Sequence, residues 1–199
     1  MAKLDLYKVH RAEYVTPKKP TLVETGEATY LAIDGQGEPG GQQFGEKIGA
    51  LYGAAFTVKM ASKAKGRDYK VCALEALWWG DSENFAATPK HTWRWKVMIR
   101  TPDFVGQDDL DQAVAALKAK GKDPSVAEVR LETIDEGQCV QVLHVGPYDA
   151  EDAAIQAMAD FAVEQGLRLH GLHHEIYLSD PRRMPPERLR TILRHPVGP

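Results

Sequence analysis

The segment HHEIYLSDPRR, residues 173–183, places a glutamate among apolar and aromatic side chains in a run typical of a β-strand. Because side chains alternate across a strand, His173, Glu175 and Tyr177 are expected to share one face. A carboxylate in apolar surroundings is unfavourable unless a cation, hydrogen-bond donors or water accompany it. The position of this glutamate therefore needs a physical reason.

A second glutamate, Glu75, has a comparable setting in VCALEALWWGD, residues 71–81. Strand alternation places Glu75 on the same face as Trp79. In the nearby run HTWRWKVMIR it places Trp93 and Trp95 together on one face. Both glutamates are thus expected beside large aromatic side chains.

Three interpretations of these glutamates remain open. The plainest is an edge-strand carboxylate paired with a local cation such as Arg182 or Arg183. In the second, the glutamates are counter-charges for a cationic ligand whose flat body stacks on Trp and Tyr rings. In the third, one glutamate is a general base or acid that activates water.

Other chemical patterns are weaker. His170, His173 and His174 lie close to Glu175, but the order of HExxH or HxxEH is missing and adjacent strand residues diverge. The glycine-rich stretch DGQGEPGG lacks the spacing of a nucleotide-binding loop, and no serine lies in a GxSxG turn. We therefore expect no metal and no cofactor. The two cysteines, Cys72 and Cys139, lie in apolar runs and are predicted to be buried thiols.

Composition places the chain among ordinary globular proteins. It has 199 residues, 43% of them hydrophobic and 27% charged, with a formal net charge of −3. This charge gives no electrostatic reason to expect nucleic acid or an anionic membrane as a direct partner. The start of the chain lacks the apolar core of a signal peptide, and no run approaches the roughly 18 apolar residues of a spanning helix. A cytoplasmic location is expected.

Periodicity predicts the elements that position these residues. Apolar residues at helical spacing, from Phe44 to Val58, predict a core-facing helix over 42–60. Further helices are predicted over 103–121 and 148–166, the last with Gly166 after its final turn. Strands are predicted in the ranges 29–34, 71–79, 91–100, 126–137, 138–146, 173–180 and 191–197.

The order of these elements suggests an internal repeat. Strand-helix-strand-strand occurs in a first module, about 21–100, and again in a second, about 125–199, with a connecting helix between them. In this alignment Glu75 matches Glu175. The predicted fold class is α+β, an antiparallel sheet with helices on one face. A single domain over 21–199 is expected to follow an N-terminal arm, residues 1–20, whose TPKKP breaks regular structure.

Five motifs in order resemble the GyrI-like small-molecule-binding family, whose fold is shared with effector domains of multidrug-responsive transcription activators. The motifs are KPTLVETGEATYLAIDGQG, LEALWW, HTWRWKVMI, HVGPYDAED and HEIYLSDPRR. The resemblance runs from about Lys19 to Val197. It implies two pseudo-symmetric modules about a twofold axis with a ligand cleft between them, in agreement with the repeat.

The resemblance also implies roles for particular residues. In effector-domain members a buried glutamate meets lipophilic cations, and Glu175 is at the matching position. Stand-alone members without a DNA-binding headpiece include hydrolases that open the cyclopropane of alkylating natural products. Glu175 and Tyr177 are the expected catalytic residues. The expected ligand-binding residues are Glu75, Trp79, Trp95, Tyr148 and His173.

The expected function is therefore binding of flat hydrophobic, including cationic, small molecules, with hydrolysis of strained electrophiles such as cyclopropanoid alkylators left open. The alternative is a regulatory protein that, like gyrase inhibitors, acts by binding a protein partner. One fold hosts both kinds of activity, so family resemblance does not separate them.

Overall fold

The computed structural model describes residues 3–81 and 88–199. Its contacts divide the chain into two compact units. Unit 1 comprises the described residues of 1–9, 28–72 and 78–134, and unit 2 comprises 10–27, 73–77 and 135–199. The chain passes more than once between the units, so each is treated separately.

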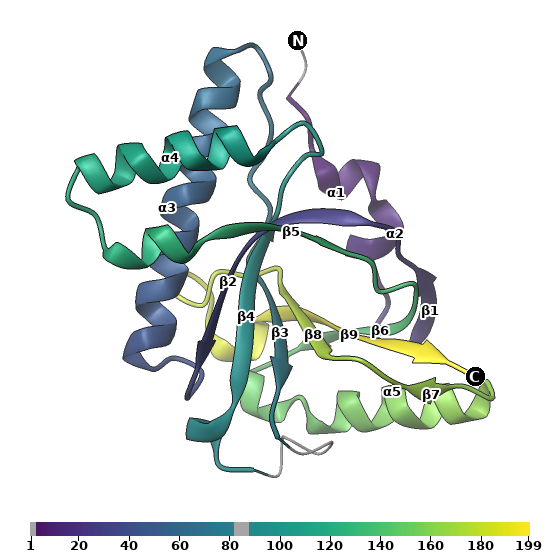
Figure 1. Ribbon diagram of the computed structural model, residues 1–199. Coiled ribbons are helices and arrows are strands. Elements are labelled where there is room, and N and C mark those ends of the chain that lie inside the picture. The colour runs from purple at the N-terminus through teal and green to yellow at the C-terminus, as the bar shows by residue number, and fades with distance from the viewer. Residues whose placement is uncertain (1–2, 82–87) are drawn as a thin grey trace. The chain divides into compact units, whose positions relative to one another are not determined.

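Helices and strands are interspersed along the described chain (Figure 1). The α-helices are α1 (Leu6–Val9), α2 (Arg11–Tyr14), α3 (Gln42–Ala64), α4 (Gln107–Ala119) and α5 (Asp152–Glu164). The strands are β1 (Thr21–Glu24), β2 (Ala28–Gln36), β3 (Glu75–Trp79), β4 (Arg94–Arg100), β5 (Arg130–Ile134), β6 (Gln138–Val145), β7 (Arg168–Leu169), β8 (His173–Tyr177) and β9 (Arg190–Gly198).

In unit 1, β2 is the central strand. It pairs antiparallel with β4, from Tyr30 opposite Arg100 to Gln36 opposite Arg94, and on its other side with β5. The long helix α3 packs on β2 and β4, and α4 packs against α3 (Figure 1). Val58 of α3 is fully buried and belongs to the apolar cluster of this unit. The helical stripe predicted from the sequence is therefore the stripe that builds this core.

Aromatic side chains fill the space between α3 and its strands. Trp95 of β4 is fully buried, lies edge-on to Phe44 at 4.9 Å between ring centroids, and donates its indole N–H to the carbonyl of Gly37 at 3.2 Å. Gly35 lies opposite Trp95 in the β2–β4 register. A Cβ at Gly35 would be only 2.0 Å from the Cη2 atom of Trp95, so this glycine gives the indole its space.

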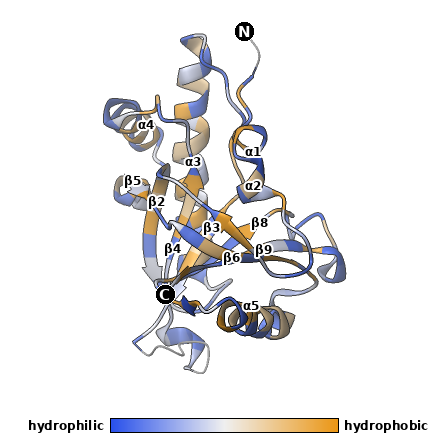
Figure 2. Ribbon diagram, turned by 90° about the vertical axis from the view of Figure 1, so that its right-hand side faces the viewer, coloured by the Kyte–Doolittle hydropathy of each residue, from blue (hydrophilic) through white to orange (hydrophobic). Residues whose placement is uncertain are grey.

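In unit 2, β9 has the central place. It pairs antiparallel with β6 and β8, and β6 pairs in turn with β1. Helix α5 carries both hydrophobic and hydrophilic residues (Figure 2). It buries Met158 and Ala162 against Val140 and Leu193. The first residues of β3 also belong to this unit, and the amide of Tyr177 donates to the carbonyl of Leu74 at 3.0 Å.

The α+β class and the repeated element order are confirmed. The first half runs β2-α3-β3-β4 and the second β6-α5-β8-β9, with short β7 added. In each half the first strand pairs antiparallel with the last. Gly166 follows α5 with φ of +73°, as its predicted place after the last turn requires. No helix among the described residues is long and apolar enough to cross a membrane.

A network of buried charges links three segments of unit 2. His174 of β8 is fully buried, with Nε2 3.0 Å from Oε2 of Glu75 and Nδ1 2.9 Å from Oε2 of Glu136. Arg194 of β9 lies 3.4 Å from the same oxygen of Glu136. Tyr14 of α2 donates to Oε1 of Glu75 at 2.9 Å. Two carboxylates thus face two cations.

These contacts set the protonation of the network. Burial alone would lower the pKa of His174, but the charges and hydrogen bonds of Glu136 and Glu75 outweigh it and raise this pKa to about 9. Burial acts to raise the pKa of Glu136, but His174 and Arg194 hold it down at about 2. At neutral pH the imidazolium of His174 and the carboxylate of Glu136 therefore coexist.

Replacing Gly35 by alanine should destabilise the protein by about 1–3 kcal/mol or more, because the added Cβ overlaps a fully buried indole. Urea denaturation of the variant measures this. Gly49→Ala in α3 is the matched control, since nothing lies within 4 Å of its added Cβ and alanine favours helix by about 0.5–1 kcal/mol. Equal midpoints for the two variants would contradict the packing argument.

The second prediction concerns His174 and pH. The folded state raises its pKa from 6.5 to about 9, so its stabilisation is fully present below pH 6.5 and is lost as pH rises through about 9. The change amounts to roughly 3 kcal/mol of unfolding free energy. In His174→Gln the fall in stability over this range should be correspondingly smaller, as measured by urea denaturation at several pH values.

Exposed His91 provides the control, as His91→Gln should reproduce the wild-type pH profile. A profile for His174→Gln that parallels the wild type would show that the network does not hold the imidazolium.

Candidate functional site

A second group of polar and aromatic side chains lies on the other face of β8. Glu175 is opposite Leu193 and Tyr177 is opposite Thr191 in the β8–β9 register. Leu193 packs against α5, so this is the face that α5 partly covers. We call the group the Glu175 cluster, and its members are Tyr148, Glu151, His173, Glu175, Tyr177 and Thr191.

Direct contacts hold the carboxylate of Glu175 in place. The hydroxyl of Tyr177 donates to Oε2 at 2.7 Å, and Nε2 of His173 lies 3.4 Å from Oε1. The ring of Tyr148 meets that of Tyr177 edge-on, with 5.6 Å between centroids. The side chain of Glu175 is 14% exposed and Tyr148 is 39% exposed, so the cluster runs from the interior to the surface.

The acidic groups of the cluster influence one another. Burial, and then the negative charge of Glu175, raises the pKa of Glu151 to about 9. The same two influences, together with the charge of Glu151, raise the pKa of Tyr148 to about 12. Near neutral pH, Glu151 is therefore a neutral carboxylic acid beside the charge of Glu175. Such a pair supplies one proton donor and one acceptor.

Two buried polar atoms around this pair, Oε1 of Glu151 and Nε2 of His173, have no hydrogen-bond partner among the described residues. The buried hydroxyl of Thr191 interacts with the carboxyl group of Glu151 and acts to lower its pKa. Buried polar groups in proteins are nearly always paired with protein or water. Their concentration in one place indicates a position where water or a ligand completes the hydrogen bonds.

The structure does not bring Glu75 to this cluster. Glu75 is fully buried and contacts His174, which alternates with Glu175 along β8. The two glutamates therefore lie on opposite faces of this strand, although the sequence repeat aligns them. Glu75 is held by His174 and Tyr14 in the buried network.

The tryptophans predicted to bind ligand belong to unit 1. Trp95 is fully buried against Phe44 and Gly35, so its indole offers no ligand-accessible surface. Trp79, the last residue of β3, is half-buried. The predicted residues that lie together are thus Tyr148, His173, Glu175 and Tyr177, all in unit 2.

The contacts described for Glu175 are those with Tyr177 and His173, and both arginines considered as its partners contact Asp180. Arg182 contacts Asp180 at 2.9 Å and Arg183 approaches the same carboxylate at 3.6 Å. Within the described residues no group of three or more His, Cys, Asp or Glu side chains could hold a metal ion. Both cysteines are buried free thiols, as predicted.

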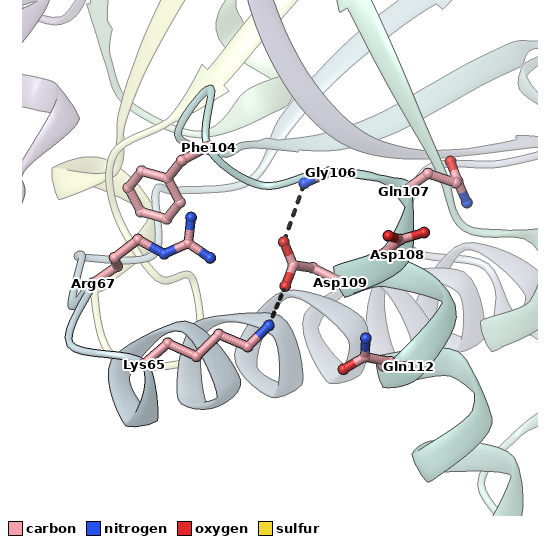
Figure 3. A pocket seen from close by; sticks show the side chains of 8 residues that line it. All are labelled: Lys65, Arg67, Phe104, Gly106, Gln107, Asp108, Asp109 and Gln112. Carbon is pink, nitrogen blue, oxygen red and sulfur yellow. Dashed lines mark hydrogen bonds and ion pairs between the residues drawn. The ribbon is translucent and has the colours of Figure 1, made fainter.

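A separate hollow of about 490 Å³ lies in unit 1 beside the start of α4 (Figure 3). Its polar groups already engage one another. Lys65 contacts Asp109 at 2.8 Å, and the amide of Gly106 donates to the same carboxylate at 3.2 Å. None of the residues predicted to bind ligand lines it.

Sequence reasoning missed Glu151, Thr191 and Tyr14. Glu151 follows the HVGPYDA turn, where strand and helix periodicities do not apply, and Thr191 resembles any polar residue of a strand. Tyr14 lies in the segment predicted as an arm, yet it is 5% exposed. The register of β8 and β9 would have identified Thr191, because it places Thr191 opposite Tyr177.

Comparison with solved structures shows which proteins this chain is similar to. An uncharacterized conserved protein from Listeria innocua is 35% identical over 98% of this chain and 100% of its own, with a TM-score of 0.93. A hydrolase from the same organism is also 35% identical over 99% of this chain and 100% of its own, with a TM-score of 0.90. The C-terminal domain of EcmrR, 14% identical over 90% of this chain and 97% of its own, shares the fold at a TM-score of 0.59.

A search of curated proteins gives no match. The family model described as the GyrI-like small molecule binding domain matches residues 18–197, which include both units almost entirely. The chain therefore belongs to the GyrI-like family of small-molecule-binding domains.

Proposed function

We propose that the protein binds flat hydrophobic molecules, including aromatic monocations, at the Glu175 cluster. The observation that carries the proposal is the group of buried polar atoms without protein partners beside Glu175, Tyr148 and Tyr177. Family membership supports a small-molecule ligand. The carboxylate of Glu175 offers a counter-charge, and the two tyrosine rings offer apolar faces.

The protonation of the acidic pair limits the ligand's charge. Because burial and the neighbouring charge of Glu175 raise the pKa of Glu151 to about 9, Glu151 adds no negative charge near pH 7. A ligand with a single positive charge is therefore favoured over a dication. Participation of Glu75 and Trp79, a protein partner and a cytoplasmic location stay predictions.

We also propose hydrolysis of a strained electrophile at the same place. Two Listeria innocua structures at 35% identity are described as hydrolases, which supports this choice of reaction class. The substrate considered is a cyclopropane conjugated to a carbonyl. Water forms a C–O bond to a ring carbon, a ring C–C bond breaks, and its electron pair becomes that of an enolate.

The cluster has groups for each part of this step. Glu175 takes the proton released by water, and Tyr177 holds that carboxylate through its 2.7 Å hydrogen bond. Tyr148 is a donor to the enolate oxygen. Partial burial keeps bulk water away, which strengthens each of these interactions. No covalent enzyme intermediate and no redox change are required.

The binding proposal is tested with rhodamine 6G, a planar aromatic monocation. We expect a dissociation constant in the micromolar range, and roughly 10- to 100-fold weaker binding by Glu175→Gln because a buried charge partner is lost. Dye fluorescence anisotropy gives both constants. Glu187→Gln, a change at an exposed carboxylate of the same unit, should bind as the wild type does. Equal affinities for all three proteins would refute a site at Glu175.

The hydrolytic proposal is tested with a spirocyclopropyl cyclohexadienone. Ring-opened product, heavier by one water, should appear faster with protein than in buffer when followed by mass spectrometry. Removal of the base in Glu175→Gln should lower kcat by about 10²- to 10⁴-fold while KM for this uncharged substrate changes little. Glu187→Gln is again the control. If product forms at the buffer rate, or equally fast with Glu175→Gln, the protein is a binder without this activity.

A further inference from the structure

Glu151 is a buried carboxyl group that forms no ion pair within the described part of the chain. It immediately precedes α5, yet its side chain makes no capping hydrogen bond to the helix. Only its backbone carbonyl serves the first turn, accepting from the amides of Ala154 at 2.9 Å and Ile155 at 3.0 Å. The residue is 5% exposed, and Oε1 has no partner among the described residues. Burial of such a group costs stability.

Among the described residues, the groups that act on Glu151 are the acidic side chains of Glu175 and Asp152 and the hydroxyl of Thr191. Glu175 faces it from β8, Asp152 follows it in α5, and Tyr148 lies three residues before it. Burial and the charge of Glu175 keep its pKa far above the usual 4.5, so that the carboxyl retains its proton at neutral pH. A neutral carboxyl group is a hydrogen-bond donor, which a carboxylate is not.

Two further observations direct this donor toward a ligand. Thr191 lies opposite Tyr177 in the β8–β9 register, and its buried hydroxyl hydrogen-bonds with the carboxyl group of Glu151, which places that carboxyl beside β9. Nε2 of His173 is also buried without a hydrogen-bond partner, and it lies 3.4 Å from Glu175. Donors and acceptors thus converge on the same place from β8, β9 and the start of α5. A water-sized or larger group with oxygen atoms would satisfy them.

We propose that Glu151 binds an oxygen atom of the ligand, donating a hydrogen bond from its neutral carboxyl to a carbonyl conjugated with the ligand's planar ring system. This inference rests on the proposed function and specifies the class of ligand. Glu175 recognises a positive charge or a water molecule, whereas Glu151 recognises a ketone, enone or dienone oxygen. The site then prefers oxygenated planar molecules to planar hydrocarbons of the same size.

In the hydrolytic step Glu151 has a defined task. As the ring C–C bond breaks and water adds, the enolate oxygen takes the proton of Glu151 while Glu175 takes one proton of the water. Atoms and charges balance, and the two carboxyl groups end with their protonation states exchanged. Transfer of one proton from Glu175 to Glu151 through solvent restores the starting state. Tyr148 remains a hydrogen-bond donor to the same oxygen and keeps its own proton.

The test uses two fluorescent probes that differ in one group. The ketone is 6-propionyl-2-dimethylaminonaphthalene, and the matched compound, 2-dimethylaminonaphthalene, lacks the propionyl group. Partition of the two compounds into octanol gives the ratio of affinities expected from hydrophobicity alone. We expect the ratio measured for the wild type to favour the ketone roughly tenfold more than this. Glu151→Gln keeps a neutral donor and should retain this preference. Glu151→Met removes the donor and should lose it.

Controls separate the role of Glu151 from effects on folding. Asp152→Asn changes an exposed acidic residue of the same helix start and should leave both affinities unchanged. Circular dichroism melts establish folding, and Glu151→Met should melt at or above the wild-type temperature because a buried unpaired carboxyl is removed. Infrared spectra at pH 7 should contain a C=O stretch of a protonated carboxylic acid that Glu151→Gln abolishes.

The possible outcomes are distinct. If the ketone preference is the same in the wild type and Glu151→Met, or the infrared band is absent, the role of Glu151 is overturned while binding at Glu175 stands. If neither naphthalene nor rhodamine 6G binds, the proposed function fails and this inference fails with it. Loss of the preference in Glu151→Met with retention in Glu151→Gln supports the donor role directly.

Discussion

The energetic cost of burying an ionised group explains how unit 2 is organised. A charge removed from water must be matched by an opposite charge or by hydrogen bonds, or else it is neutralised by proton uptake. On one side of β8 the charge of His174 is matched by Glu75 and Glu136. On the other side, Glu151 lies beside Glu175 without a cation, and it is neutralised by keeping its proton.

These two solutions have different consequences for function. On the His174 side the protein supplies the partners itself. Tyr14 donates a hydrogen bond to Glu75, and Arg194 forms an ion pair with Glu136. This network contributes stability and holds the segment before β1 against the strands. The Glu175 side has buried polar atoms without a hydrogen-bond partner in the described part of the chain, and the ligand proposed for this site would supply those hydrogen bonds.

Much of the fold could be predicted because it depends on local periodicity. The helical stripe containing Leu51 and Val58 and the glycine after α5 are properties of short segments. Alternation along β8 likewise placed His173, Glu175 and Tyr177 together. These three residues interact directly in the folded chain.

The rest depends on pairings between distant segments. Matching Glu75 to Glu175 by repeat order could not reveal that Glu75 meets the opposite face of β8, since one residue of register reverses a strand's faces. The sequence predicted that Trp95 stacks on a ligand, but the close packing of its indole against Gly35 shows that the ring is enclosed. Glu151 carries no periodic signal, and its importance depends on being buried beside Glu175.

The uneven distribution of aromatic residues makes the two units optically distinct. The four tryptophans of the chain, Trp78, Trp79, Trp93 and Trp95, all belong to unit 1, whereas Tyr148 and Tyr177 belong to unit 2. Tryptophan fluorescence can be excited at the long-wavelength edge of tryptophan absorption, where tyrosine does not absorb. This fluorescence therefore comes from unit 1 alone. Tyrosine absorbance in the near ultraviolet includes unit 2. Comparing the two signals during denaturation distinguishes separate loss of the units from a single cooperative transition.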